Sequence, residues 1–128
     1  MKTVFITGAA SGIGLITAQM FAKQGYFVGL YDINLEAIND LLTNVDFSNA
    51  CGGFCDVTDT NSIEAAFADF AKHTDGVLDV LINNAGVLSS GSFVELPQKS
   101  NDLMIDINIK GLTNVSLLGH PLLKSTPN

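Results

Sequence analysis

A glycine-rich turn at residues 7–14 constrains the fold of this 128-residue chain more than any other feature. Its sequence is Thr-Gly-Ala-Ala-Ser-Gly-Ile-Gly, and it follows residues 4–6, a β-branched and aromatic run that predicts a short buried strand. After the turn, apolar residues recur at helical spacing until Gly25 ends the segment; they are Ile13, Ile16, Met20 and Phe21. A strand, a glycine turn and a helix in this order indicate the first unit of an α/β fold.

The three glycines of this turn suit a bound dinucleotide. Gly8 lets the chain turn tightly, Gly12 leaves no side chain where a pyrophosphate would approach the backbone, and Gly14 permits close packing of helix on strand. The helix that follows offers backbone N–H groups and the positive end of its dipole to phosphates. This context predicts a dinucleotide site, and the alternative is a glycine turn that serves packing alone.

Strands and helices alternate along the rest of the chain. Apolar runs predict further strands at residues 26–31, 53–57 and 78–82, and helical periodicity predicts helices at 35–45, 63–70 and about 98–118. The last helix is expected to lie between Pro97 and Pro121. Four such units predict an α/β fold with a Rossmann-type, doubly wound parallel sheet and helices on both faces. Since no linker or repeat interrupts it, we expect residues 1–128 to belong to a single domain.

Composition disfavours several classes of partner. The chain has 6 Lys, no Arg and 13 acidic residues, giving a net charge of −7, which argues against nucleic acid because phosphate contacts need clustered cations. The same charge argues against an anionic membrane surface, and no apolar run is long enough to cross a bilayer. We therefore expect no nucleic-acid partner and no membrane association.

The cysteines and histidines show no pattern of a metal or catalytic site. Cys51 and Cys55 have poor spacing for zinc and are expected to be small apolar residues in or near a strand. Two thiols without a secretion signal are typical of a cytoplasmic protein. His73 is expected on the surface at a helix end and His120 near the end of the last helix, and neither is expected to be catalytic.

An acidic residue ends the second predicted strand, 18 positions after Gly14. A carboxylate at Asp32 can accept hydrogen bonds from the hydroxyls of an adenosine ribose, and it would repel a 2′-phosphate. Ser11, Ile33 and Asn34 offer no cation for such a phosphate. The pattern therefore favours NAD over NADP. A cap for the helix that starts near residue 35 is the structural alternative, and the two roles are compatible.

Four motifs together resemble one known family, the short-chain dehydrogenases/reductases. The first is the glycine turn, with the spacing T-G-x-x-x-G-x-G, and the others are Asp56-Val57, Asn83-Asn84-Ala85-Gly86 and Asn108-Ile109-Lys110-Gly111. They occur in the family's order and with similar spacing, and the resemblance covers essentially all of the chain. It implies a sheet with the strand order 3-2-1-4, and a fifth strand beyond the fourth that this chain does not reach.

The resemblance also implies roles for individual residues. The glycine turn would hold the pyrophosphate, Asp32 the adenosine ribose, Asp56 and the Val57 backbone the adenine, and the segment after the fourth strand the adenosine side of the cofactor. The cofactor-binding residues implied are Gly8, Ser11, Gly12, Ile13, Gly14, Asp32, Asp56, Val57, Asn83, Ala85 and Gly86. Asn108 matches the asparagine that holds a water in the family's proton relay and distorts its helix, which makes it the implied catalytic residue.

Physical alternatives stand beside these roles. Asn83 and Asn84 end a buried strand, where side-chain amides can satisfy unpaired backbone groups. Asn108 would by composition alone be a surface residue. Gly111 in a helix costs about 1 kcal/mol relative to Ala, which favours close packing or a bend at that position.

The family's catalytic serine and its Tyr-x-x-x-Lys pair are not found in this chain. Tyr26 and Tyr31 are its only tyrosines, and the residues four positions after them are Leu30 and Leu35. The family's tyrosine acts as an acid or base and its lysine lowers the pKa of that tyrosine. We therefore expect residues 1–128 to be the N-terminal, cofactor-binding part of an NAD-binding Rossmann domain that is truncated before strand 5 and inactive alone.

The resemblance implies an NAD-dependent oxidoreductase that transfers hydride between the nicotinamide and a secondary alcohol or its ketone, a small molecule. Family members commonly form dimers or tetramers through the helix corresponding to 98–118, so a homo-oligomer is implied. Two alternatives remain open. One is a natural short protein that binds NAD without turnover, for example as a hetero-oligomer subunit, and the other is a relic of a truncated gene without function.

Overall fold

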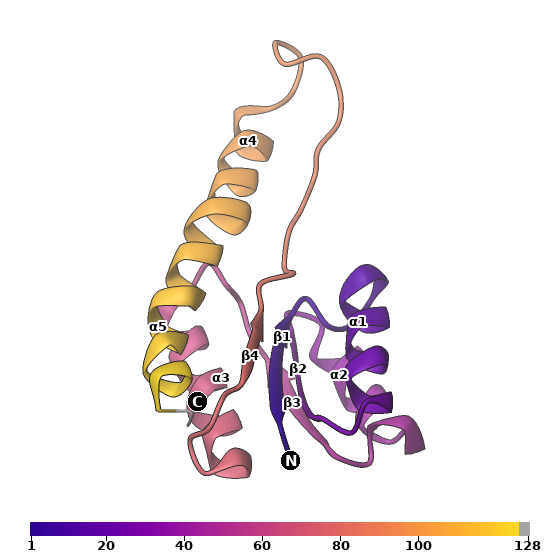
Figure 1. The fold of residues 1–128 in the computed structure, drawn as a ribbon. Helices are drawn as coiled ribbons and strands as arrows, with labels where there is room; N and C mark the ends of the chain where they lie inside the picture. Colours follow the sequence, from indigo (N-terminus) through magenta and orange to yellow (C-terminus); the bar gives the residue numbers. More distant parts are fainter. Residues whose placement is uncertain (126–128) are drawn as a thin grey trace.

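The structure, a computed structural model, describes residues 1–125, so the last three residues of the predicted 1–128 domain lie outside the described part. Helices lie on both faces of a parallel sheet with the strand order β3-β2-β1-β4 (Figure 1). The elements are β1 (Thr3–Thr7), α1 (Gly12–Lys23), β2 (Phe27–Asp32), α2 (Leu35–Leu42), η1 (Val45–Phe47), β3 (Ala50–Phe54), α3 (Thr60–Thr74), β4 (Val80–Ile82), α4 (Gln98–Ile105), η2 (Asp106–Gly111) and α5 (Leu112–Lys124). The predicted fold class and strand order are confirmed.

Side chains of β1 alternate between two apolar layers, as the pleat of a strand requires. Phe5 lies on the face covered by α3 and α5, where its ring stacks on Tyr31 and Phe67 with centroid distances of 4.4 Å in both pairs. Val4 and Ile6 lie on the opposite face, which α1 and α2 cover (Figure 1). Burial of both faces explains why the strands are apolar throughout rather than alternating.

The apolar positions predicted for α1 form a helix, but three of the four lie outside the core and only the fourth, Phe21, packs against it. Gly14 and Ala18 are its buried residues, whereas Ile13, Ile16 and Met20 are 79%, 59% and 57% exposed. Small residues face the sheet because they let the helix backbone approach closely, and this leaves the larger side chains outside. A periodicity of apolar residues could not distinguish these two faces.

Several element boundaries differ from the prediction. Strand β3 covers Ala50–Phe54 rather than 53–57, because Ala, Cys and Gly give a weak strand signal. Gly52 is required there, since an added Cβ would overlap the Leu30 carbonyl of β2. Strand β4 is shorter than predicted, at Val80–Ile82, and among the strands that the structure describes it pairs with β1 alone. Helix α2 ends at Leu42, before the predicted residue 45.

The long C-terminal helix continues past Pro121 instead of ending before it. It consists of α4, the π-helical stretch η2 and α5, which reaches Lys124. Proline removes one hydrogen bond from a helix, but Leu122 and Leu123 of the last turn pack against the core and offset that loss. Among the described residues, no helix combines the length and the apolar character that a membrane crossing demands.

Candidate cofactor-binding site

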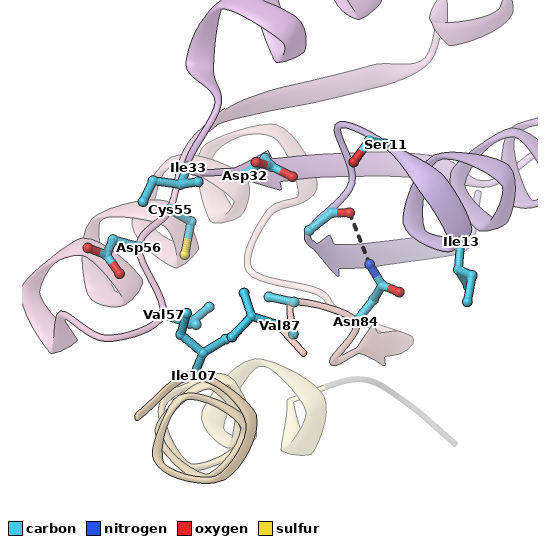
Figure 2. Close-up of a pocket in the computed structure, with 13 residues that line it drawn as sticks. Ser11, Ile13, Asp32, Ile33, Cys55, Asp56, Val57, Asn84, Val87 and Ile107 are labelled. Carbon is cyan, nitrogen blue, oxygen red and sulfur yellow. Dashed lines mark hydrogen bonds between the residues drawn. The ribbon is translucent and has the colours of Figure 1, made fainter. Parts of the chain in front are cut away.

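A cleft of about 440 Å³ lies at the carboxyl ends of the parallel strands (Figure 2). Its walls come from the glycine turn, from the ends of β2 and β3, from the segment after β4 and from η2. This is the edge at which open parallel sheets bind ligands, because the strand order reverses there. The lining residues are Gly8, Ser11, Ile13, Asp32, Ile33, Cys55, Asp56, Val57, Asn84, Ala85, Gly86, Val87 and Ile107.

The glycine turn has the geometry that its sequence predicts. Gly8 has φ +65°, and a Cβ there would lie 2.9 Å from the Cα of Ala85. Gly12 has φ +57°, and a Cβ there would meet nothing within 4 Å. A Cβ on Gly14 would overlap the Gly8 carbonyl and the Asn84 amide, so α1 sits directly on the turn. Gly8 and Gly14 therefore allow close packing, and Gly8 also lines the cleft, whereas Gly12 and Gly14 are not among its lining residues. Gly12 is the first residue of α1 and has open space where a Cβ would lie.

Thr7 and Asn84 tie the glycine turn to the segment after β4. Thr7 Oγ1 accepts hydrogen bonds from the backbone N–H groups of Asn84 and Ala85, at 3.1 and 3.0 Å. The Asn84 side-chain Nδ2 donates to the Thr7 carbonyl at 3.1 Å and to the Gly8 carbonyl at 2.9 Å. Figure 2 shows the second of these bonds. Sequence reasoning assigned neither side chain to the site. The sequence feature that could have indicated them is a polar residue at or just after the end of each of two buried apolar strands.

Asp32 connects the glycine turn with the loop after β2. Its Oδ2 accepts from the Ala10 N–H at 3.0 Å, and its Oδ1 accepts from the Asn34 N–H at 2.9 Å. The N-cap of α2 is Asn34, whose side chain accepts from Ala37 at 3.1 Å. Asp32 is half-buried and lines the cleft, where each carboxylate oxygen keeps a second lone pair for a ligand hydroxyl.

The loop after β3 places Asp56 and Val57 at the opposite wall. Asp56 Oδ1 accepts from the backbone N–H and the hydroxyl of Thr58, at 2.9 and 2.7 Å. Val57 is buried, and a Cβ on Gly111 would lie 2.8 Å from Val57 Cγ2. The expected close packing at Gly111 is therefore present, and it holds the loop against the long helix.

Cys55 lines the cleft, which sequence reasoning did not foresee. Burial raises the pKa of this thiol from 9.0 to about 12, and the charges of Asp56 and Asp32 add to the effect. The thiol is therefore neutral at physiological pH and presents a small apolar surface to the cleft. This agrees with the prediction that both cysteines are small apolar residues in or near a strand.

The cofactor-binding residues implied for the segment after β4 do not all lie in the cleft. Ala85 and Gly86 line the cleft, but Asn83 does not. Asn83 Nδ2 donates to Ser116 Oγ on α5 at 3.0 Å, while its buried Oδ1 has no hydrogen-bond partner among the described residues. Successive residues of an extended chain point in opposite directions, so Asn83 and Asn84 reach different elements.

Asn108 lies in η2, and both the oxygen and the nitrogen of its side-chain amide form hydrogen bonds with the backbone of Val87. Its Oδ1 accepts from the Val87 N–H at 2.9 Å, and its Nδ2 donates to the Val87 carbonyl at 2.7 Å. The helix is widened into a π-helical stretch at this residue, so the distortion implied by the resemblance is present. The side chain is exposed as composition alone predicts, yet it has specific partners.

Neither tyrosine faces the cleft. Tyr31 is buried on the α3 side of the sheet, and its hydroxyl donates to Asp69 Oδ2 at 2.8 Å. Tyr26 packs edge-on against Phe21 at a centroid distance of 4.9 Å. Of the two histidines, His73 is exposed in the last turn of α3 and His120 is exposed near the end of α5, both as expected.

Comparison with known proteins matches the chain to a family model described as short chain dehydrogenase, over residues 2–128. The chain is 42% identical over 118 residues to oxidoreductase UcpA of Salmonella typhimurium, covering 90% of this chain and 44% of that protein. It is 36% identical over 110 residues to sorbitol dehydrogenase of Cereibacter sphaeroides, covering 86% of this chain and 42% of that protein. The chain thus spans less than half the length of these relatives.

The fold also matches a solved structure. A short-chain dehydrogenase/reductase from Brucella melitensis, titled as a glucose/ribitol dehydrogenase, superposes with a TM-score of 0.88 at 24% identity. The match covers 94% of this chain and 52% of that one. At this identity the likeness concerns the fold, and the family assignment depends on the sequence match over residues 2–128. On that match, the chain belongs to the short-chain dehydrogenase/reductase family.

Proposed function

We propose that the cleft binds NAD and that the protein is an oxidoreductase acting on a small secondary alcohol or its ketone. The observation that carries this proposal is the open space before Gly12 at the N-terminus of α1, with the Asp32 carboxylate at the neighbouring strand end. The first backbone N–H groups of a helix have no partner within it and attract phosphate. A pyrophosphate fits this space because Gly12 presents no side chain to it.

Each implied residue has a definite part in holding the cofactor. Gly12, Ile13 and Ser11 border the pyrophosphate position, and Asp32 accepts hydrogen bonds from the adenosine ribose. Asp56 and Val57 border the adenine position on the opposite wall. Ala85 and Gly86 form the floor between the two walls. Gly14 and Asn83 support this arrangement by packing without lining the cleft, whereas Gly8 both lines the cleft and packs closely against Ala85.

Charge favours NAD over NADP. Asp32 and Asp56 are the charged residues that line the cleft, and none of its lining residues, all within 1–125, is Lys or Arg. A 2′-phosphate would lie beside the Asp32 carboxylate without a compensating cation, and like charges at short range destabilise a complex. The diol of NAD instead supplies two donors to that carboxylate.

The cofactor, when bound, supplies the nicotinamide that accepts or donates hydride. The described chain binds and orients it, and Asn108 fixes the segment at Val87 that borders the cleft. The proton of the alcohol requires a tuned acid or base, and neither Tyr26 nor Tyr31 reaches the cleft. We therefore propose that residues 1–128 are the cofactor-binding part of a larger domain, with the catalytic Ser, Tyr and Lys supplied by sequence beyond them. The match to UcpA covers only 44% of that protein's length, which supports the proposal that this chain is part of a larger domain.

Two features support further parts of the proposal. The long C-terminal helix exposes Leu103, Ile105, Ile109, Leu112 and Leu117, and such an apolar surface favours a homo-oligomer, a dimer or tetramer. The two free thiols and the acidic charge fit a cytoplasmic protein.

A second candidate is an NAD-binding module or hetero-oligomer subunit without turnover. The observation that favours it is that the binding elements of the cleft lie together within residues 1–125, while its lining includes no Tyr or Lys. Absorbance of NADH with a panel of secondary alcohols distinguishes the two. Turnover supports the enzyme, and NAD binding without turnover supports the module.

Calorimetric titration with NAD and NADP tests the binding proposal. We expect NAD to bind at least about tenfold more tightly than NADP, a difference of about 1.4 kcal/mol. Asp32→Asn should weaken NAD binding and reduce the ratio of the NAD and NADP affinities. Asp40→Asn, on the exposed face of α2, should leave both affinities unchanged. Equal affinities for both dinucleotides, or no binding by a folded protein, would overturn the proposal.

A further inference from the structure

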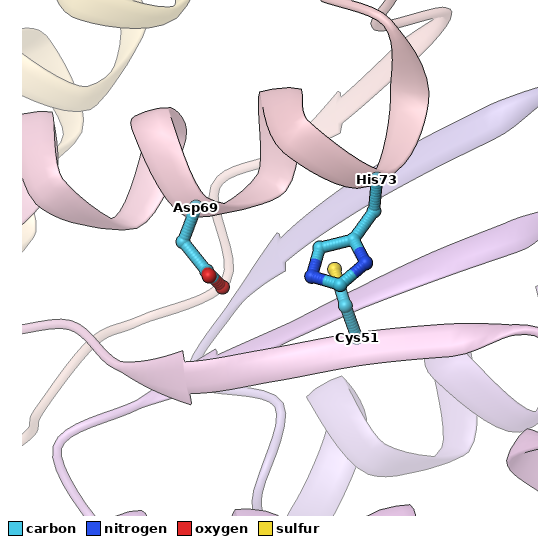
Figure 3. Close-up of side chains that lie close together, drawn as sticks. All are labelled: Cys51, Asp69 and His73. Atoms are coloured by element: carbon cyan, nitrogen blue, oxygen red, sulfur yellow. The ribbon is translucent and has the colours of Figure 1, made fainter.

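Three side chains that are common metal ligands converge between β3 and α3, outside the cofactor cleft. The Sγ of Cys51, a carboxylate oxygen of Asp69 and a ring nitrogen of His73 all lie within 4.8 Å of one another (Figure 3). Figure 3 shows the His73 ring next to the sulfur of Cys51, with the Asp69 carboxylate one helical turn along α3. None of the three belongs to the lining of the cleft.

The fold explains why these residues meet. Asp69 and His73 are separated by four positions, so they project from the same face of α3. Cys51 lies on β3, the edge strand of the sheet, and its side chain is buried in the layer that α3 covers. A helix pair at i and i+4 with a third ligand from another element is a spacing that zinc sites use. The sequence spacing of Cys51 and Cys55 could not reveal this set.

Neighbouring aromatic residues contact all three side chains. The Tyr31 hydroxyl donates to Asp69 Oδ2 at 2.8 Å and lies 3.6 Å from the Cys51 sulfur. Asp69 Oδ1 can bind a metal while Oδ2 keeps this hydrogen bond, which is how outer residues orient metal-binding carboxylates. The His73 ring lies against Phe27, with centroids 6.2 Å apart and planes 21° from parallel.

We propose that Cys51, Asp69 and His73 form a zinc-binding site with three protein ligands, completed by a water molecule. Thiolate, imidazole and carboxylate are the ligand types that zinc takes, and a mixed S, N and O set disfavours magnesium and calcium. Zinc–ligand bonds of about 2.0–2.3 Å place tetrahedral ligand atoms roughly 3.5 Å apart. The present spacing needs a closure of about 1 Å, which rotation of the exposed His73 and the half-exposed Asp69 side chains provides.

The binding step is an exchange of a proton for a metal. The Cys51 S–H bond breaks, the sulfur forms a bond to Zn²⁺, and the proton passes to solvent without any change in oxidation state. The charges of Zn²⁺, the thiolate and the carboxylate then sum to zero. Exposure of His73 gives the metal and its water a path from solvent.

Cobalt(II) titration followed by absorbance tests the proposal, because Co²⁺ occupies zinc sites and reports both its geometry and its ligands. We expect intense tetrahedral d–d bands, a sulfur-to-cobalt charge-transfer band in the near ultraviolet, and loss of both on addition of Zn²⁺. Cys51→Ser should abolish the charge-transfer band. His73→Gln and Asp69→Asn should each weaken binding by at least about tenfold.

Matched controls come from the chain itself. Cys55→Ser removes the other buried thiol, and His120→Gln removes the other exposed histidine, so both variants should bind Co²⁺ as the unmodified protein does. His73→Gln changes an exposed side chain and is expected to fold normally, so it decides the matter if Cys51→Ser does not fold. Weak octahedral bands without charge transfer, or equal affinity of His73→Gln and the unmodified protein, would overturn the proposal.

Discussion

The side-chain amide of Asn84 donates a 2.9 Å hydrogen bond to the carbonyl of Gly8, across 76 positions of sequence. The same amide group bonds the Thr7 carbonyl at 3.1 Å, so one side chain holds the end of β1 and the start of the glycine turn. A Cβ on either Gly8 or Gly14 would clash with this amide. The position of the turn, and with it the open space before Gly12, therefore depends on a residue of the segment after β4.

Replacement of this amide tests that dependence. Asn84→Asp keeps the size of the side chain but turns a donor toward two carbonyls into a negatively charged acceptor. Loss of these partly buried hydrogen bonds should lower the free energy of unfolding by about 1–3 kcal/mol and weaken NAD binding. Urea denaturation and calorimetry measure the two effects. Asn39→Asp on the exposed face of α2 serves as the control, and an equal loss in both variants would contradict the interpretation.

The glycines of the turn should separate binding from stability. Gly12→Ala places a methyl group in the open space before α1 and should abolish most NAD binding. Its positive φ also costs roughly 1–2 kcal/mol in stability. Gly25 has φ +81° and likewise open space around a Cβ, so Gly25→Ala should show the same stability loss with NAD binding intact. Comparable affinities for the two variants would show that the open space does not receive the cofactor.

Gly14→Ala should act chiefly on stability. The added methyl group would overlap the Gly8 carbonyl, a backbone atom that cannot rotate away. Overpacking of this kind typically costs about 1–3 kcal/mol, and thermal or urea unfolding measures it. A Gly14→Ala protein as stable as the unmodified one would mean that α1 can move off the turn.

The Cys55 thiol should make the protein less stable at high pH. Burial raises the pKa of this group from 9.0 to about 12 in the folded state, so the folded protein retains a proton that the unfolded chain releases. Its contribution to stability is complete below pH 9 and is lost as pH rises from 9 toward 12. Cys55→Ala should therefore show a smaller decline in unfolding free energy over this range. If the unfolding free energy of Cys55→Ala declines as much as that of the unmodified protein, the pH dependence does not come from this thiol.

Asn108 should restrain the segment that follows β4. Both amide atoms of its side chain bond the backbone of Val87, so Asn108→Ala leaves that N–H and carbonyl without these partners. We expect faster hydrogen exchange of the Val87 amide, by at least about tenfold if the bonds contribute about 1.4 kcal/mol. Asn101→Ala, on α4 of the same long helix, is the control, and equal exchange in both variants would rule out this restraint.

The parallel sheet and the location of the cleft could be predicted because both follow from local patterns, whereas the strand order was implied by the resemblance to the family. Apolar runs separated by helical periodicity require a parallel sheet, and parallel strands bring Asp32, Asp56 and Ala85 to one edge through their position at strand ends. The spacing of the glycines also predicted the turn geometry at Gly8 and Gly12. No knowledge of distant contacts was needed for the sheet type, the cleft or the turn.

Other features depend on contacts that a local pattern does not encode. Ile13 and Ile16 have the periodicity of a core face, but the sheet accepts the small residues of α1 instead. The direction of Asn83 toward Ser116 depends on the placement of α5. The group of Cys51, Asp69 and His73 arises only when α3 lies over the edge strand. Apolar packing of Leu122 and Leu123 likewise outweighs the proline that precedes them.

The pairing of β1 with β4 has a consequence for the order of events in folding. Val4 lies beside Val80 in the sheet, and the Thr3 N–H donates to Asp79 Oδ2 at 2.7 Å across 76 positions. Closing so long a loop costs more chain entropy than the β1–β2 or β2–β3 pairings, which makes it a slow step. A nascent chain can form the three-stranded sheet first, but it acquires the floor of the cleft only after residues 80–86 have left the ribosome.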